Sequence, residues 1–443
     1  MRKVFPVAIF TLVLAGVFVI LFSVFPKNTG VLIFFLILLF LDLYLWTWVR
    51  NVIARTSRWF QKAVVFLFWL PLILLSGVII FGFSFPFIQW NPVAQTYVIS
   101  GFFAIFLCSF FPILFLLLAD LIGGSVYLLH RLIPGKLKAM VRYQRSNRLV
   151  SAGWIIGGLF FLLMGCGMIF WKYDFKVTQQ IINLPELPVS FEGTKIVQVS
   201  DIHLGSWTNK RKLEEVVEQV NQLRPDIIFF TGDMFNYTTK EGTGFKTILK
   251  RLHAPLGIIA ILGNHDYGDY ITWSSPSAKV KNMEDLVVYY KLLGWKLLRN
   301  ENVILRKGAD SIAILGVENW GSTRRFQRFG DIGKAQKGTG KMAIRILLSH
   351  DPSHWDRIIS RYYPSIDLTL SGHTHGGQFG IDLPGIHWSP VSWMESQWCG
   401  LYAVPRIGHP QYLYVNQGLG CIGYSGRIGI LPEITLFTLK RVK

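Results

Sequence analysis

Acidic side chains are almost absent from the first 171 residues of this 443-residue chain, where only Asp42 and Asp120 occur. The same stretch contains 13 of the 45 Lys and Arg residues. Because a soluble domain devotes about a quarter of its residues to charged side chains, this scarcity excludes an ordinary water-facing domain in the first part of the chain. Internal repeats and low-complexity segments are also absent, which excludes a repeat array.

Long apolar runs fill the stretch that lacks charge. Each is long enough to cross ~30 Å of hydrocarbon, and we predict five spans at residues 7–25, 31–49, 63–84, 97–119 and 152–171. The first run has no convincing signal-peptide cleavage site before Lys27 and further spans follow it directly, so we interpret it as a retained helix. Gly153 and Gly157 have the spacing that lets two membrane helices pack closely.

Basic residues are missing from the loop between the third and fourth predicted spans, residues 86–96. The loops after the second and fourth spans are rich in Lys and Arg, and such loops face the cytoplasm. Five spans then place the N-terminus in the cytoplasm and residues 172–443 outside it, in a multi-pass protein of the cell membrane. A different number of spans would reverse this orientation.

The two membrane carboxylates have two interpretations. A carboxylate within a membrane span is a functional candidate by default. The alternative, which we favour, places Asp120 at an interface and pairs Asp42 with a nearby base such as Arg50.

Cysteine is scarce, with four residues in the whole chain. Cys108 and Cys166 lie within predicted spans and serve as apolar filler. Cys399 and Cys421 lie in the globular part, where a disulfide outside the cytoplasm and two free buried thiols both remain open.

The rest of the chain alternates short apolar strands with helical patterns, which indicates a layered α/β core. We predict strands at 195–200, 226–230, 256–262, 342–348, 367–370 and 412–415, and helices at 210–223 and 283–293. The predicted organisation is a membrane domain at 1–171, a connector at 172–194 and a catalytic domain at 195–443.

Five polar blocks follow five of the predicted strands. They are Asp201-Ile202-His203, Gly232-Asp233, Gly263-Asn264-His265-Asp266, Ser349-His350-Asp351 and Gly372-His373-Thr374-His375. Ligands gather at the carboxyl ends of strands in open α/β sheets, so we expect these side chains to converge on one site.

The donor types in these blocks indicate two divalent metal ions. Mixed imidazole and carboxylate ligands fit Mn, Fe, Zn or Ni better than Mg or Ca. Two ions roughly 3.5–4 Å apart clamp a phosphoryl group and lower the pKa of a water between them, which then attacks phosphorus. Asp233 is placed to bridge the ions. His265 is spare as a ligand and can act on the leaving oxygen or stabilise charge on phosphorus, with Asp266 orienting it.

The five blocks, in this order, resemble the calcineurin-like metallophosphoesterases over residues 195–443. The later Gly418-Leu419-Gly420, Arg427 and Pro432-Glu433 resemble the membrane-attached bacterial branch of that family. The resemblance implies a four-layer αββα sandwich with two mixed sheets. It also implies that Asp201, His203, Asp233 and His375 hold one metal, that Asp233, Asn264, His350 and His373 hold the other, and that His265 is the catalytic histidine. Arg427 is left with two interpretations, contact with a substrate phosphate or a salt bridge to Glu433.

Three functions are compatible with this sequence. The favoured one is a membrane-anchored, manganese-type di-metal phosphoesterase whose phosphodiester, phosphomonoester or pyrophosphate substrate, possibly lipid-linked, lies at the surface of membrane lipids. Some relatives cleave the pyrophosphate of a nucleotide-linked lipid A precursor on the cytosolic face, and that activity is an alternative, as is a non-enzymatic membrane binding protein. A nuclease is disfavoured, because residues 172–443 contain no interleaved aromatic and basic segment for stacking bases.

Overall fold

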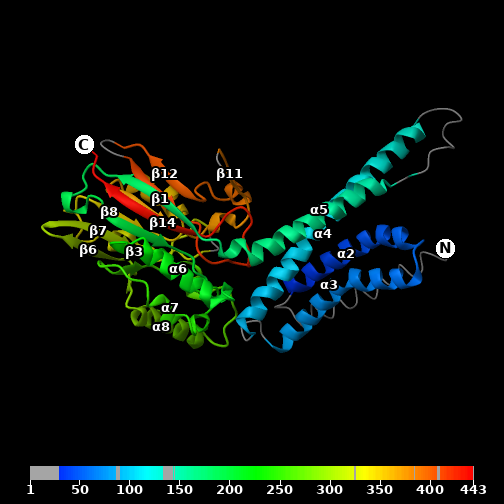
Figure 1. Cartoon of the computed structure of the whole chain (residues 1–443), viewed down its shortest axis with the longest axis horizontal. Helices are drawn as coiled ribbons and strands as arrows, with labels where there is room; N and C mark the ends of the chain where they lie inside the picture. The colour runs from blue at the N-terminus through cyan, green and yellow to red at the C-terminus, as the bar shows by residue number, and fades with distance from the viewer. Residues whose placement is uncertain are drawn as a thin grey trace. The chain divides into compact units, whose positions relative to one another are not determined.

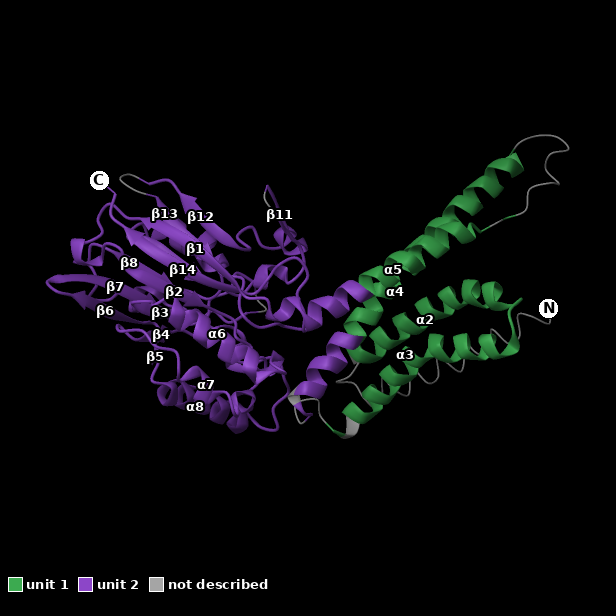
Figure 2. Cartoon of the chain, viewed as in Figure 1, with its two compact units in different colours: residues 1–85, 102–161 green, residues 86–101, 162–443 purple. Residues whose placement is uncertain are grey.

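The computed structural model describes residues 29–85, 90–132, 143, 145–323, 326–383, 385–406 and 410–442. Figure 1 shows apolar helices followed by a domain of mixed sheets and helices. Contacts among the described residues define two compact units, one within residues 1–85 and 102–161 and the other within 86–101 and 162–443 (Figure 2). Helices α4 and α5 each contribute residues to both units.

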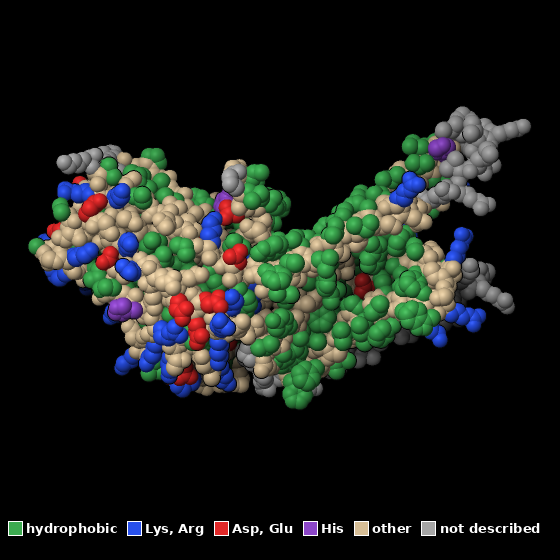
Figure 3. Space-filling model, in the orientation of Figure 1, with side chains coloured by type: hydrophobic (Ala, Val, Ile, Leu, Met, Phe, Trp, Pro, Cys, Tyr) green, Lys and Arg blue, Asp and Glu red, His purple; other side chains and the backbone are tan. Residues whose placement is uncertain are grey.

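Four helices in the described part of the chain are long and apolar enough to cross a membrane. They are α2 (Thr29–Ile53), α3 (Arg58–Ser84), α4 (Pro92–Leu132) and α5 (Asn147–Ile169). Exposed hydrophobic side chains cover them, whereas charged side chains of both signs are scattered over the second unit (Figure 3). Four of the five predicted spans are therefore confirmed as apolar helices, and the span at 7–25 lies outside the described residues.

Close contact between α4 and α5 depends on the two glycines that the sequence singled out. A Cβ at Gly153 would lie 2.8 Å from Cβ of Phe115, and one at Gly157 would lie 2.7 Å from the carbonyl oxygen of Cys108. Both distances are shorter than van der Waals contact. The predicted close packing at this pair is therefore confirmed, because any larger side chain would push the helices apart.

The membrane carboxylates have different surroundings. Asp120 forms an ion pair with Arg145 at 2.5 Å and accepts a hydrogen bond from the hydroxyl of Tyr44 at 2.7 Å. Asp42 lines a cavity of about 290 Å³ among α2, α3, α4 and α5. The expected pairing of Asp42 with Arg50 is wrong, since no such ion pair occurs in the described part of the chain.

Two six-stranded sheets form the centre of the second unit. The first sheet has the order β1 (Lys176–Asn183), β14 (Glu433–Lys440), β2 (Lys195–Val199), β3 (Ile227–Phe230), β4 (Ile258–Ala260) and β5 (Lys296–Leu297). The second has the order β12 (Gly400–Val404), β13 (Gln411–Val415), β9 (Leu368–Ser371), β8 (Arg345–Leu348), β7 (Asp310–Gly316) and β6 (Glu301–Lys307). A separate hairpin pairs β10 (Ile381–Leu383) with β11 (Ile386–Trp388).

Strand β3 shows why the sheets form inner layers. Side chains alternate between the two faces of a strand, and Ile227 and Phe229 pack in the core that both sheets share. Ile228 and Phe230 face the opposite way, into a second core that includes residues of α6, α7 and α8. A continuous apolar run is what a strand covered on both faces requires.

Helices cover the outer faces of both sheets. The first sheet is covered by α6 (Lys210–Gln222), α7 (Lys246–Leu249) and α8 (Pro276–Leu293). The second sheet packs against α9 (Ile332–Ala335), and the short α10 (Ser360–Tyr362) lies between β8 and β9 in the chain. α6 buries Leu213, Val216, Val217 and Val220, one helical face. The predicted α/β layers are confirmed, with helices outside two stacked sheets.

The segment that the sequence marked as a connector, residues 172–194, contains a strand of the sheet. β1 pairs in parallel with β14 along eight residues, from Lys176 opposite Glu433 to Asn183 opposite Lys440. Burial alternates along most of β1, but the apolar residues do not follow it, because Val177 and Ile181 are on the exposed face while Ile182 is buried. The sequence pattern therefore gave no strand signal here, and the last strand of the chain supplies the pairing.

The ends of α4 and α5 pack into the second unit through polar contacts. Thr96 donates its hydroxyl to the carbonyl of Gly205 at 3.1 Å, and the hydroxyl of Ser100 accepts the backbone amide of Ser425 at 2.7 Å. Lys172, which follows α5, is buried and donates to the carbonyl of Ser206 at 2.6 Å. These helix ends are therefore part of the same compact body as the sheets.

Packing between the sheets predicts a large cost for truncating Phe229, whose side chain is fully buried. We expect Phe229→Ala to lower the free energy of unfolding by about 3–5 kcal/mol, because a cavity replaces the ring. Thermal melting of the detergent-solubilised chain, followed by near-ultraviolet circular dichroism, measures this. Val288→Ala, at an exposed position of α8, is the matched control, and equal midpoints for both variants would contradict the packing.

Candidate metal centre

The five polar blocks lie at the carboxyl ends of five strands. β2, β3 and β4 of the first sheet run parallel to one another and end just before Asp201, Asp233 and Asn264. β8 and β9 of the second sheet are also parallel and end just before His350 and His373. The topology therefore brings these side chains together as predicted, because the parallel strands of each sheet end at the same edge.

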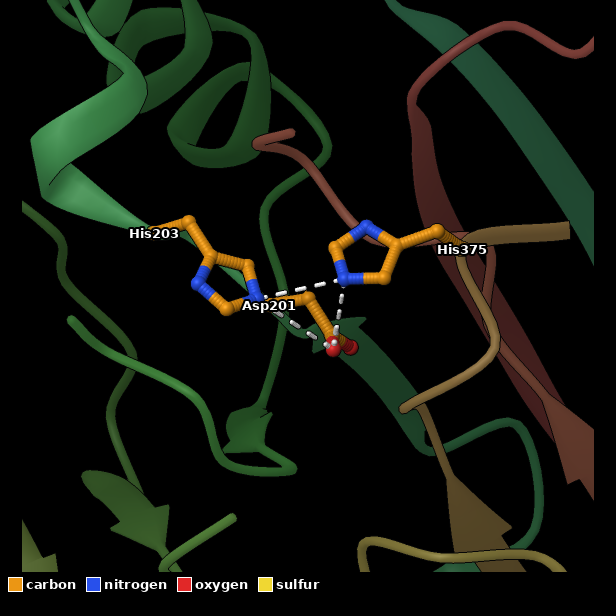
Figure 4. Close-up of side chains that lie close together, drawn as sticks. All are labelled: Asp201, His203 and His375. Atoms are coloured by element: carbon orange, nitrogen blue, oxygen red, sulfur yellow. Dashed lines mark hydrogen bonds and ion pairs between the residues drawn. The ribbon is translucent and has the colours of Figure 1, made fainter. Parts of the chain in front are cut away.

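Three of these side chains surround one point (Figure 4). The Nε2 atoms of His203 and His375 lie 3.2 Å apart, and Nε2 of His375 lies 3.4 Å from Oδ1 of Asp201. Oδ2 of Asp233 lies 3.5 Å from Nε2 of His203. The donor atoms of Asp201, His203 and His375 all lie within 4.8 Å of one another, so these three residues could hold a metal ion.

Asp233 also contacts a second group of donor atoms. Oδ2 of Asp233 lies 3.2 Å from Nε2 of His350, which in turn lies 3.1 Å from Oδ1 of Asn264. Nδ1 of His373 approaches that amide oxygen to 2.7 Å. Asp201, Asp233 and His350 form the second donor cluster that could hold an ion. Asp233 therefore faces both groups.

These spacings fit metal coordination. Bonds of about 2.0–2.2 Å from nitrogen and oxygen ligands place neighbouring donors roughly 3–3.5 Å apart. The His203–His375, His375–Asp201 and Asp233–His350 separations all fall in this range. Neutral imidazole nitrogens and carboxylate oxygens face one another here, with too few protons between them for every atom to be hydrogen-bonded. This set of lone pairs therefore suits metal cations.

The backbone is strained where it carries these side chains. Asp201, His203, Asp233, His373 and His375 all have positive φ, between 47° and 75°. Few residues other than glycine adopt this left-handed region, and each such residue costs about 1–3 kcal/mol. Strain concentrated on the converging donors indicates that the turns are shaped by the site and not by local propensity.

Other contacts fix the orientation of two of the imidazoles. Nδ1 of His350 lies 2.7 Å from the carbonyl oxygen of Thr231, and Nε2 of His373 lies 3.7 Å from Oδ2 of Asp351. A carbonyl accepts only, so Nδ1 of His350 carries a proton and its Nε2 is free to bind an ion. Asp351 belongs to the fourth sequence block, but the sequence does not indicate its role, because His373 becomes its neighbour only in the folded chain.

His265 lies beside the first group without belonging to it. Its ring meets the His203 ring edge-on, with 4.9 Å between the ring centroids, and stacks on the Tyr270 ring, with 4.0 Å between the centroids. Nδ1 of His265 lies 2.8 Å from the carbonyl oxygen of Asn236, so the proton on Nδ1 is donated to that carbonyl. The other ring nitrogen, Nε2, is left to face a ligand.

The predicted role of Asp266 in orienting His265 is wrong. The carboxylate of Asp266 accepts the backbone amides of Asp233 at 3.0 Å, Met234 at 3.0 Å and Gly263 at 2.9 Å. It therefore shapes the two turns that carry Asp233 and Asn264, while a backbone carbonyl orients the histidine. Short side chains such as Asp bond readily to nearby amides, and only the folded turn shows which amides are within reach.

Glu241 holds the loop that orients His265. Its buried carboxylate accepts the amides of Gly205 at 3.1 Å, Asn236 at 2.6 Å, Tyr237 at 2.7 Å and Thr238 at 3.0 Å. Burial raises the pKa of Glu241 to about 7, although these four amides favour the charged form. No pattern in the sequence singles out this residue, because a glutamate in a short loop carries no signal of its own.

Burial and charge set the protonation of the site. Burial lowers the pKa of His203 to about 3 and also lowers the pKa of His265 and His375, so all three imidazoles are neutral near pH 7. Burial raises the pKa of Asp201 to about 6. Burial opposes the charged form of Asp233 too, but the adjacent His350 outweighs it and holds the pKa of Asp233 well below its usual range.

Arg427 has neither of the roles considered from sequence. The residue is fully buried, and its guanidinium donates to the carbonyls of His375, Gln417, Gly418 and Gly420 at 2.7–3.3 Å. Glu433 instead accepts the hydroxyl of Tyr414 and the amide of Gln417. Arg427 therefore ties the His375 turn to the loop after β13.

All four cysteines are free in this structure, and Cys399 and Cys421 are both buried. Of the two possibilities left open by the sequence, the structure has two unpaired thiols.

Comparison with known proteins agrees with this geometry. Residues 194–377 match the calcineurin-like phosphoesterase family, and residues 27–172 match a family described as a probable calcineurin-like phosphoesterase transmembrane domain. The uncharacterized metallophosphoesterase YkuE of Bacillus subtilis is 31% identical over 60% of this chain and 85% of its own length.

Two further relatives match a similar share of this chain. UDP-2,3-diacylglucosamine pyrophosphatase LpxG of Chlamydia trachomatis is 30% identical over 55% of this chain and 83% of its own length. A transmembrane protein with metallophosphoesterase domain from Danio rerio is 30% identical over 60% of this chain, and the match spans 57% of that protein. The family is one of metal-dependent hydrolases with a dinuclear site. The resemblance inferred from the five blocks is confirmed, and this multi-pass chain belongs to the calcineurin-like metallophosphoesterases.

Proposed function

We propose that this metal-dependent hydrolase cleaves a phosphodiester, phosphomonoester or pyrophosphate bond of a substrate presented at the membrane surface. The observation that carries the proposal is the carboxylate of Asp233, which lies 3.5 Å from Nε2 of His203 and 3.2 Å from Nε2 of His350. A single buried carboxylate between two sets of nitrogen donors is what a bridged pair of ions requires.

The proposed ligands follow the two groups. Asp201, His203, Asp233 and His375 would hold one ion, and Asp233, Asn264, His350 and His373 the other. When bound, the ions neutralise charge on the phosphoryl group and make a water acidic enough to supply the nucleophile. The oxygen and imidazole donors fit Mn, Fe, Zn or Ni.

His265 is the proposed catalytic histidine. Its Nδ1 proton is committed to the carbonyl of Asn236, so Nε2 is the atom that meets the substrate. The neutral ring has no proton on Nε2, so it first takes one up there from water and then stabilises charge on a phosphoryl oxygen or passes that proton to the leaving oxygen. Glu241 and Tyr270 keep the ring in place, the first through the Asn236 loop and the second by stacking.

The proposed side of the membrane is the one opposite the basic loops. Arg55 lies between α2 and α3, and Arg145 precedes α5. Since Lys and Arg concentrate in cytoplasmic loops, α5 would end outside the cytoplasm and the metal centre would lie there. The opposite orientation has one supporting observation, the likeness to LpxG, whose named substrate favours a lipid-linked pyrophosphate as the second candidate.

Removing the bridging carboxylate should empty the centre. We expect Asp233→Asn to lower bound metal from two ions per chain to one or none, and to reduce hydrolysis of bis(p-nitrophenyl) phosphate by about 10²–10³. Inductively coupled plasma mass spectrometry of the purified protein measures the metal. Asp285→Asn, at an exposed position of α8, is the control. Two retained ions in Asp233→Asn would contradict the bridging assignment.

Replacing the catalytic histidine should separate chemistry from metal binding. We expect His265→Ala to keep its metal while kcat falls by about 10²–10⁴, because no proposed ligand is lost. Steady-state kinetics with the metal content measured on the same sample tests this. The exposed His253→Ala should behave as the unmodified protein, and a His265→Ala enzyme with full kcat would remove His265 from the mechanism.

The orientation can be tested by fusing reporters to the C-terminus. We expect alkaline phosphatase after Lys443 to be active and green fluorescent protein at the same position to be dark, because both would be outside the cytoplasm. Moving the reporters into the basic loop after Arg55 should reverse both signals. Fluorescence at the C-terminus would place the centre in the cytoplasm and favour the lipid-linked pyrophosphate.

A further inference from the structure

The hairpin β10–β11 and the turn after it expose an unusual amount of apolar surface. We call residues 381–394 the apolar lobe; of these, residue 384 lies outside the described residues. Exposed large side chains gather in it: Ile381 (42%), Leu383 (62%), Ile386 (56%), Trp388 (39%), Trp393 (78%) and Met394 (83%). Hydrophobic side chains are visible in Figure 3 where Figure 1 labels β11. Soluble surfaces rarely keep such a group uncovered.

The lobe also lacks charge. Residues 383–394 contain no Asp, Glu, Lys or Arg. The acidic residue at its start, Asp382, is paired with Lys176 at 2.9 Å and lies 3.1 Å from Nδ1 of His387. Its charge is therefore balanced at the base of the hairpin, and the large exposed side chains at described positions beyond it are apolar or aromatic.

The base of the lobe is joined to the point where the chain leaves its last membrane helix. Lys176 is the first residue of β1 and follows Ile169, the last residue of α5, by seven positions. The amide of Gly380 donates to the carbonyl of Ile428 at 2.9 Å, and the adjacent Arg427 donates its own amide to the carbonyl of Gly167 in α5 at 3.2 Å. One continuous set of bonds thus links α5 to the lobe.

The lobe also borders the turn at residues 375–377, which carries His375. A Cβ at Gly377 would collide with Ser389 and lie 3.0 Å from Cβ of Val391, so the 375–377 turn packs directly against the lobe. Thr374, between the two histidines of the last block, donates its hydroxyl to the carbonyl of Trp398. A surface that holds the lobe therefore also fixes the turn that carries His375.

We propose that the apolar lobe docks into the interfacial layer of the bilayer that α5 spans, on the side where α5 ends. The occupant is lipid because the lobe is tied to the end of a membrane helix whose last residue, Ile169, is 65% exposed and is followed by Phe170, which is 64% exposed. Tryptophan side chains favour the boundary between headgroups and acyl chains, where the ring is buried and the N–H is hydrated. Docking holds the metal centre close to lipid-borne phosphate esters.

A fluorescent amino acid placed at position 393 tests the docking without relying on catalysis. The full chain is reconstituted in phosphatidylcholine nanodiscs, with and without bromine on the upper part of the acyl chains. Insertion to ~5–10 Å should shift the emission to shorter wavelength and lower it roughly twofold in brominated lipid. The same probe at position 362, where Tyr362 is 69% exposed on α10, should be unaffected.

Two results would overturn the proposal. Equal emission at position 393 in both lipids would mean that the lobe stays in water. Quenching that occurs only after a brominated long-chain phosphate ester is added would mean that the lobe binds the acyl chain of a substrate instead of the bilayer.

Enzyme kinetics give a second, separate test of the docking, and this test rests on the proposed function. Trp393→Ser combined with Met394→Ser should lower the hydrolysis of a phosphate ester embedded in phosphatidylcholine vesicles by about tenfold, with soluble bis(p-nitrophenyl) phosphate cleaved as before. Val189→Ser, which also replaces an exposed apolar side chain, should change neither rate. If the unmodified protein cleaves neither substrate, the proposed function fails while the quenching result still decides the docking.

Discussion

The buried carboxylate of Asp233 is the constraint on which the rest of the site depends. Its side chain is almost completely buried, and an isolated charge in such a place is costly. The structure compensates with the backbone amide of His265 at 2.8 Å and with His350 at 3.2 Å. Those partners in turn require the turns after β4 and β8 to meet the turn after β3. The relative placement of the two stacked sheets is thus coupled to one side chain.

Strain at the centre follows from the same constraint. Five donors with positive φ would be unfavourable in isolated loops. Here Asp266 collects amides from two of the turns, and Arg427 collects four carbonyls around a third. Each of these buried groups replaces water for several backbone atoms at once, so hydrogen bonds within the protein support the shape of the turns. Preorganisation of this kind reduces the cost of assembling a coordination sphere.

The sequence predicted those parts of the fold whose signal is local. The apolar run of β3, the helical face of α6 and the blocks at strand ends each occupy a short window, and the structure has them within a few residues of the predicted positions. β1 escaped prediction because its partner β14 lies at the other end of the chain. A pairing over more than 250 residues leaves no periodic trace in either segment.

The same distinction applies to the centre. Side chains that would bind ions directly could be found from their types and spacing, whereas the groups that orient them could not. Asn236 acts through a backbone carbonyl, which every residue has, and Glu241 acts through backbone amides, which every residue except proline has. Asp266 was assigned to its neighbour in sequence, but its carboxylate turns toward amides across the site. Roles carried by the backbone become visible only once the chain is folded.

The membrane helices contribute to this preorganisation as well. Ser206 lies three residues after His203, and its carbonyl accepts Lys172, which follows α5. Gly205 beside it accepts Thr96 from α4 and donates its amide to Glu241, which holds the Asn236 loop and through it His265. One short turn therefore receives bonds from both helix ends and from the positioning groups of the catalytic histidine. A tether that only anchored the domain would not need buried Lys172 or the polar face of α4. Because these contacts exist, a displacement of either helix end would shift the turn after His203, so the geometry of the centre depends on the membrane segment to which it is attached.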